Sequence, residues 1–185
     1  MNQGRRSPRH ELRGGSGETF SPGSTGRSRQ VAVIGAGGCA QDSELALLAE
    51  EVGRRLAEAA VTVVTGGLGG VMEAASRGAA EAGGTVIGIV PGNSTEEANP
   101  HCTQVVASGV GHTRNLAVVG SGEVVIAVSG EWGTLSEIGH ARAIGRIVVA
   151  LRSWTLTGRD RMEGAPGVIP AETPEEAVAA ALEAL

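Results

Sequence analysis

Hydrophobic residues in this chain fall into short β-branched runs that alternate with segments of helical periodicity. The first run, VAVIG at 31–35, ends in glycines, as a buried strand that leads into a loop does. A helical pattern follows, with one apolar face made by Leu45, Leu48, Val52, Leu56 and Ala59. Asp42 or Ser43 is placed to cap this helix. We therefore predict a strand, a loop and a helix in the first unit.

The same unit repeats along the rest of the sequence. We expect further strands at 61–67, 85–91, 104–107, 123–130 and 146–151. Helical patterns follow at 69–83, 109–121 and 133–145, and Thr173, Pro174 and Glu176 predict the start of a last helix that runs to Leu185. Strands that alternate with helices pair in parallel through right-handed crossovers. The predicted fold is α/β, a three-layer α/β/α sandwich with a mostly parallel, Rossmann-like sheet.

Composition changes sharply near residue 30. Residues 1–29 are rich in Arg, Gly and Ser and show no apolar periodicity, so we expect a disordered tail, and a Rossmann-like nucleotide-binding domain at 30–185. The tail holds six arginines against two glutamates, whereas the domain holds 9 arginines against 18 acidic residues. Because an acidic surface repels a polyanion, nucleic-acid binding by the domain is not expected.

All 15 basic residues are arginines, which excludes two classes of chemistry. Without a lysine, the chain can neither form a Schiff base with pyridoxal phosphate nor complete a Walker-type phosphate loop. Cys39 and Cys102 lack metal-ligand spacing, so no metal site is expected. No apolar run reaches the roughly 20 residues of a membrane span, and no secretory signal is recognisable, so we expect a cytoplasmic protein.

Glycines concentrate where the predicted strands end. Because the carboxyl ends of parallel strands share one edge of the sheet, their loops should converge there on a ligand. The first loop lacks the full GxGxxG spacing, so ordinary NAD binding is not favoured. The candidate ligand-binding glycines are Gly35 and Gly37 after the first strand, Gly66, Gly67 and Gly70 after the second, and Gly130 and Gly133 after the fifth.

Three motifs, GGLGGVMEAASRGA, GHTRN and SGEWGTLSE, appear in an order that resembles the LOG-like or lysine-decarboxylase-like Rossmann family. Within it, the chain is most similar to the branch related to DprA and to molybdenum cofactor carriers. In LOG enzymes the pattern PGGxGTxxE binds a phosphate and supplies a glutamate, while an upstream arginine completes the site. The resemblance implies such roles for Gly130, Gly133, Thr134 and Glu137, with Arg114 upstream, and it also implies a homodimer or homotetramer.

Departures from the family pattern leave two functions open. Ser129 and Glu131 replace a proline and a glycine, and Asn115 follows Arg114 where catalytic members have a basic pair. These changes favour a protein that binds a small-molecule nucleotide or a pterin-type cofactor without catalysis. The alternative is a nucleoside 5′-monophosphate phosphoribohydrolase that releases free base, with Arg114 and Glu137 as catalytic residues. Neither function requires a further cofactor.

Structural explanations compete with these assignments. Thr134 and Glu137 have the spacing of a helix capping box, and Arg114 could be a surface arginine. His112 could donate to a ligand or be solvated by water. Trp132 could stack on a base or contact another subunit.

Overall fold

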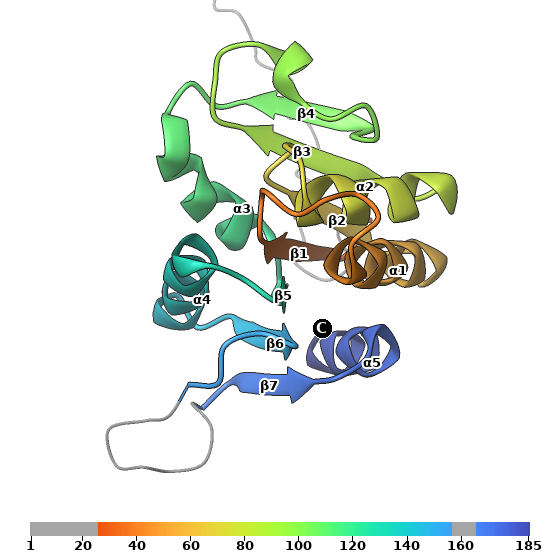
Figure 1. Ribbon diagram of the computed structural model, residues 1–185, viewed down its shortest axis with the longest axis vertical. Coiled ribbons are helices and arrows are strands. Elements are labelled where there is room, and N and C mark those ends of the chain that lie inside the picture. Colours follow the sequence, from red (N-terminus) through yellow and green to blue (C-terminus); the bar gives the residue numbers. More distant parts are fainter. Residues whose placement is uncertain (1–25, 157–165) are drawn as a thin grey trace, which may run out of the picture.

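Seven parallel strands form one sheet in the computed structural model, which describes residues 26–156 and 166–185 (Figure 1). The strands are β1 (Gln30–Gly35), β2 (Thr62–Thr65), β3 (Val86–Val90), β4 (Gln104–Ala107), β5 (Val124–Val128), β6 (Ile147–Leu151) and β7 (Val168–Ala171). Their order across the sheet is β4-β3-β2-β1-β5-β6-β7. The predicted α/β class is confirmed. The predicted tail lies outside the described residues, except for 26–29.

Helices cover both faces of the sheet, with α1, α2 and α5 on one face and α3 and α4 on the other (Figure 1). Their bounds are α1 (Glu44–Glu58), α2 (Val71–Glu81), α3 (Asn115–Ser121), α4 (Trp132–Ala143) and α5 (Pro174–Ala184), with 3-10 turns η1 (Thr95–Glu97) and η2 (Gly111–Arg114). Within the described residues, no helix is both long and apolar enough to cross a bilayer.

Two apolar layers result from the alternation of side chains along the central strands. Val31 and Val33 of β1 lie in the core beneath α1, α2 and α5, whereas Ala32 and Ile34 lie in the core beneath α3 and α4. All five residues of β5 are buried. Burial on both faces explains why the strands read as continuous apolar runs rather than as alternating ones.

Local capping signals place two helix starts correctly. Ser43 accepts a hydrogen bond from the amide of Ala46 at the start of α1, and Thr173 accepts one from Glu176 at the start of α5. The carboxylate of Glu176 in turn accepts from the amide of Glu172. The first two bonds satisfy amides that a helix leaves free at its first turn, whereas the third goes to the residue before the N-cap instead of to the N-cap amide of a capping box.

The edge strand β7 was not among the predicted elements. Its sequence, VIPA, contains Pro170, which usually argues against a strand because it has no amide hydrogen. Among the described strands β7 pairs with β6 alone, at the edge of the sheet, where one side of the strand needs no partner.

The order of the strands reverses beside β1. From β1 the chain winds outward through β2, β3 and β4, and it then returns to place β5 on the other side of β1. Loops on the two sides of such a reversal leave the sheet in opposite directions and open a crevice at its carboxyl edge. The ends of β1, β2 and β5 are therefore where a ligand site is expected.

Candidate functional site

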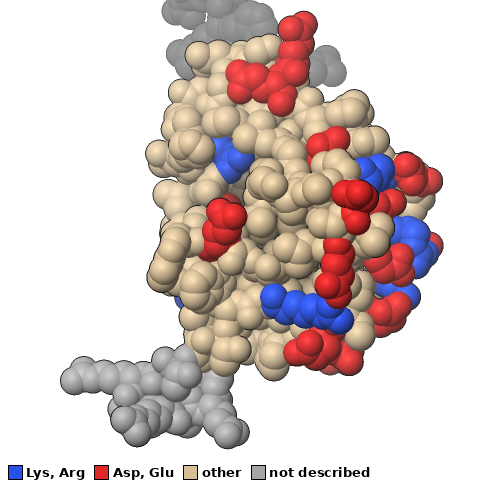
Figure 2. Space-filling view, viewed as in Figure 1, with Lys and Arg blue, Asp and Glu red and all other residues tan. Residues whose placement is uncertain are grey.

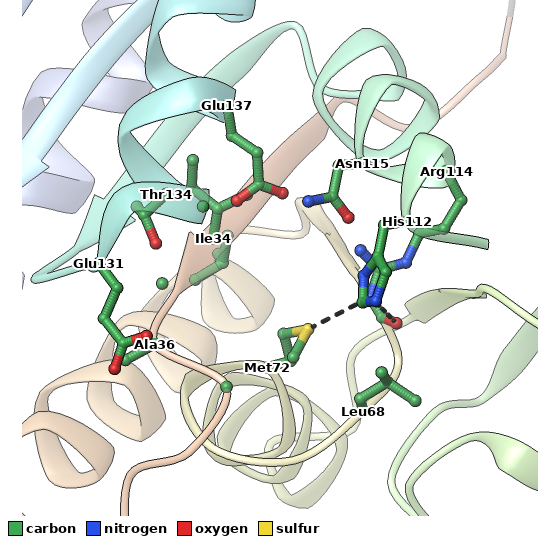
Figure 3. Close-up of a pocket in the computed structure, with 15 residues that line it drawn as sticks. Ile34, Ala36, Leu68, Met72, His112, Arg114, Asn115, Glu131, Thr134 and Glu137 are labelled. Atoms are coloured by element: carbon green, nitrogen blue, oxygen red, sulfur yellow. Dashed lines mark hydrogen bonds between the residues drawn. The ribbon is translucent and has the colours of Figure 1, made fainter.

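A pocket of about 230 Å³ occupies this crevice. It is formed by the end of β1, the loop between β2 and α2, the turn η2 with the start of α3, and the first residues of α4 (Figure 3). The volume lies below the roughly 300–1,000 Å³ of sites that enclose a whole ligand. A nucleotide-sized ligand would thus place one part inside the pocket and the rest at its rim.

Most of the residues singled out in the sequence meet at this pocket. Those that line it are Gly35, Gly37, Gly66, Arg114, Asn115, Gly133, Thr134 and Glu137. Glu131 and His112 line it as well, and both are exposed.

Three of the candidate glycines lie behind the pocket. Gly67 has φ of 72°, and a Cβ there would lie 2.7 Å from Val90. Gly70, with φ of 65°, precedes α2 and packs on the backbone of Gly37. Gly130 has φ of 134° and lies against Thr134. They shape the loops, since left-handed backbone and close approach both favour glycine.

Arg114 is buried beneath the pocket, with 5% of its surface exposed, so the alternative of a surface arginine is wrong. Its Nη2 donates a 3.1 Å hydrogen bond to the carbonyl of Gly66 and lies 3.9 Å from the sulfur of Met72 (Figure 3). Nε has no hydrogen-bond partner in the described part of the chain. Burial lowers the pKa of Arg114, and the charge of Glu137 opposes this shift.

Glu137 approaches the pocket from α4, and 9% of the residue's surface is exposed. Burial raises its pKa to about 7, although the positive charge of Arg114 acts in the opposite direction. The carboxyl group is therefore able to exist in both protonation states near neutral pH.

The capping-box alternative for Thr134 and Glu137 is also wrong. The helix α4 begins at Trp132, two residues before Thr134, and Glu131 occupies the N-cap position without a side-chain capping bond. Thr134 and Glu137 are thus helical residues about one turn apart, with Thr134 in the first turn of α4, and both are buried and line the pocket.

The start of α4 presents uncapped backbone. A helix leaves its first amides without intrahelical partners, and here no side chain of the described residues caps them. Gly133 lines the pocket, and a Cβ built there would meet no atom within 4 Å. Free amides and open space at a helix N-terminus suit an anion. The exposed carboxylate of Glu131, at the same rim, would repel one.

Asn115 contributes a second unsatisfied group. Its Oδ1 is buried and accepts no hydrogen bond from any residue that the structure describes. In Figure 3 the carboxamide lies between the carboxyl group of Glu137 and the Arg114 side chain. Unpaired buried polar atoms are rare in native proteins, and a ligand is one explanation for them.

Trp132 does not line this pocket. It is the first residue of α4 and is 76% exposed. Its ring packs against that of Trp154, with centroids 5.2 Å apart and planes inclined by 39°.

The apolar lining of the pocket escaped the sequence analysis. Ile34, Ala36, Leu68 and Met72 all line it (Figure 3). The loop motifs indicate glycines and polar residues, whereas the inward direction of Leu68 and Met72 depends on how α2 packs. Over 26–156 and 166–185, no three His, Cys, Asp or Glu side chains gather where they could hold a metal ion.

Solved structures similar to this fold include molybdenum cofactor proteins. The molybdenum cofactor binding protein of Rippkaea orientalis superposes with a TM-score of 0.75 at 30% identity, over 86% of this chain and 98% of that one. The molybdenum cofactor carrier protein of Chlamydomonas reinhardtii gives a TM-score of 0.74 at 30% identity, over 85% and 98% of the two chains. DprA from Streptococcus pneumoniae, at 21% identity and a TM-score of 0.63 over 82% of this chain and 61% of that one, shares the fold.

Sequence comparison agrees with the predicted resemblance. A protein from Archaeoglobus fulgidus, described as uncharacterized, is 39% identical over 149 residues, which is 80% of this chain and 91% of that protein. The model of the SLOG cluster4 family matches residues 28–178, from just before β1 into α5. This protein therefore belongs to the SLOG cluster4 family, whose LOG-like Rossmann fold its motifs had indicated.

Proposed function

We propose that this protein binds a phosphate-bearing nucleotide or pterin-type cofactor in the pocket at the end of β1, as a binding or carrier protein. The observation on which the proposal rests is Arg114, a buried cation at the pocket whose Nε has no partner within the described residues. The likeness to a molybdenum cofactor binding protein and a carrier protein, each at 30% identity, points to the same class of ligand.

The start of α4 is the proposed place of the phosphate. The amides near Gly133 are uncapped, and the residue borders open space at the pocket rim. The positive end of the helix dipole favours an anion at this point. Thr134, the next residue, also lines the pocket and brings a hydroxyl to the same end.

Arg114 supplies the positive charge of the pocket. No ion pair within 4.0 Å neutralises it among the described residues, and Glu137 is at least partly protonated below pH 7. A buried cation is costly unless it is paired, so an anionic ligand would gain from its field.

Titration calorimetry of the full chain with GMP, AMP and 6-hydroxymethylpterin monophosphate tests this function. We expect saturable binding of at least one ligand, competition by inorganic phosphate, and at least about tenfold weaker binding by Arg114→Gln. Arg54→Gln is the matched control, because Arg54 lies on α1, away from the pocket, and forms ion pairs with Glu51 and Glu58. If none of the three ligands binds, the proposed function is wrong.

Hydrolysis of the N-glycosidic bond is the second candidate, and the pKa of Glu137 near 7 favours it. A carboxyl group of that pKa can exchange a proton at neutral pH, as general acid–base catalysis requires. The same GMP and AMP samples, followed by chromatography for free guanine and adenine, separate the two functions. Base release that Glu137→Ala abolishes would establish the hydrolase, whereas binding without base release supports the carrier.

A homo-oligomer is proposed through the outer surface of α3 and α4. Neither a lysine, an arginine nor an acidic residue occurs in α3, and Leu116 and Ile144 expose 46% and 45% of their surfaces there. Figure 2 shows mostly uncharged atoms over these helices, while charged side chains gather on the side of α1. Light scattering should give a multiple of the monomer mass, and Leu116→Glu should reduce it.

A further inference from the structure

Three polar groups meet along one wall of the pocket: the carboxyl group of Glu137, the carboxamide of Asn115 and the guanidinium of Arg114 (Figure 3). The Arg114 Nε and the Asn115 Oδ1 are buried, and within the described residues neither has a hydrogen-bond partner. The Glu137 carboxyl group likewise makes no hydrogen bond to any described residue. The wall therefore presents hydrogen-bonding groups that the protein itself leaves unused.

The chemistry of these groups has a definite order. Arg114 can only donate, the Oδ1 of Asn115 can only accept, and an ionised Glu137 can only accept. In Figure 3, Asn115 lies between the other two. The Nδ2 of Asn115 is a donor, so the order depends on which carboxamide atom meets the ligand. A ligand edge that engages Arg114, the unpaired Oδ1 of Asn115 and an ionised Glu137 presents an acceptor, a donor and a second donor in that sequence.

Both unpaired atoms are shielded from solvent, although their side chains line the pocket. Contact with a ligand therefore requires rotation of the Arg114 and Asn115 side chains. Rotation of Arg114 about its outer bonds can leave its Nη2 near Gly66, and neither Nε nor Oδ1 has a hydrogen bond to lose. Both atoms instead gain one, which relieves the penalty of an unsatisfied buried group.

The ring and the phosphate of a bound ligand would lie at different depths in the pocket. With a phosphate at Gly133 on the rim, the ligand extends inward along α4, past Thr134 to Glu137, which is one helical turn further along. Apolar side chains of Ile34, Leu68 and Met72 line the same space, as the faces of a planar ring require.

We propose that this wall recognises a 2-amino-4-oxopyrimidine edge, the hydrogen-bonding edge shared by guanine and the pterins. The ring carbonyl accepts from the Nε of Arg114, the ring N–H donates to the Oδ1 of Asn115, and the exocyclic amino group donates to the carboxylate of Glu137. This assignment rests on the proposed function, because it specifies the ring of the ligand whose phosphate lies at α4.

The assignment predicts discrimination between closely related rings. Hypoxanthine keeps the carbonyl and the ring N–H but lacks the amino group, so Glu137 would lose its partner. Adenine presents an amino group and an unprotonated ring nitrogen in place of the carbonyl and N–H, so its edge opposes both Arg114 and Asn115. A site that leaves a buried polar group unpaired rejects the deficient ligand strongly.

The experiment compares ligands that differ only at this edge, by calorimetry on the full chain at pH 8. GMP is measured against IMP, and 6-carboxypterin against 6-carboxylumazine, which carries an oxygen in place of the amino group. We expect the amino compound of the pair that binds to be favoured at least about tenfold. Glu137→Gln should reduce that ratio to about two or less, while Glu58→Gln, an exposed residue on α1, should leave it unchanged.

The possible outcomes distinguish a failure of edge recognition from a failure of the proposed function. Equal affinity for both members of a pair, or a preference that Glu137→Gln leaves intact, would overturn the edge recognition. The proposed function would still stand in that case if the ligands bind and inorganic phosphate competes with them. Absence of binding by all four compounds, and by AMP and 6-hydroxymethylpterin monophosphate as well, would reject both. A comparison of the two pairs also tells whether the edge belongs to a nucleotide or to a pterin.

Discussion

Arg114 and Glu137 line one pocket from η2 and α4, yet no ion pair within 4.0 Å joins them in the described structure. Burial favours the neutral form of each group, so it raises the pKa of Glu137 and lowers the pKa of Arg114. The charge of each group partly offsets the pKa shift of the other. Because the two groups do not neutralise each other directly, both remain free to pair with a ligand.

The first prediction concerns the pH dependence of stability. The folded-state pKa of Glu137, about 7, lies above its ordinary value of 4.5, so its contribution is fully present below about pH 4.5 and is lost as pH rises through 7. Between pH 5 and 8.5 the wild type should lose up to about 3 kcal/mol more unfolding free energy than Glu137→Gln, which does not ionise. Urea denaturation at both pH values measures the difference. Parallel pH profiles for the two proteins would contradict the raised pKa.

Substitution of Arg114 should separate binding from stability. Arg114→Gln removes a buried charge that has no ion-pair partner, together with one hydrogen bond to Gly66, so the net change in unfolding free energy should be within about 1 kcal/mol. Ligand affinity should fall at least about tenfold. Denaturant unfolding and calorimetry on the same preparation give both values. A large loss of stability with unchanged affinity would assign Arg114 a purely structural role.

Removal of the carboxylate at the rim should strengthen phosphate binding. Glu131 lines the pocket at the N-cap of α4, so its carboxylate would repel a phosphate bound at the start of this helix. Glu131→Gln should tighten binding of inorganic phosphate and of GMP about three- to tenfold at low ionic strength, with the gain diminishing as salt is added. Glu96→Gln, in the exposed turn η1, is the control. Unchanged affinity would place the phosphate away from α4.

Close packing of α1 on α2 predicts a contrast between two glycines. A Cβ at Gly53 would lie 2.0 Å from the carbonyl oxygen of Ala75, so Gly53→Ala must push the helices apart and should destabilise by about 1–3 kcal/mol or more. A Cβ built at Gly139, inside α4, would meet no described atom within 4 Å outside the backbone of its own helix. Gly139→Ala should stabilise by up to about 1 kcal/mol through helix propensity. Thermal unfolding of both variants checks the opposite signs, and two similar melting shifts would contradict the packing argument.

Local patterns in the sequence determined the order of the elements and the edge at which the ligand loops gather. Short apolar runs, glycines after strands, and the caps at Ser43 and Thr173 act over a few residues, so they can be recognised without the rest of the fold. The strand β7 could not be recognised in this way, because Pro170 is acceptable only at the sheet edge that tertiary packing provides.

Only the tertiary structure decided where the candidate site residues lie. The motif at 129–137 suits both a cap and a ligand site, and the start of α4 at Trp132 placed Thr134 and Glu137 inside the helix and toward the pocket. Burial of Arg114 likewise depends on Gly66 and Met72, more than 40 residues away along the chain. A side chain's exposure and its unpaired atoms depend on neighbours brought from distant segments, and a local pattern contains no information about them.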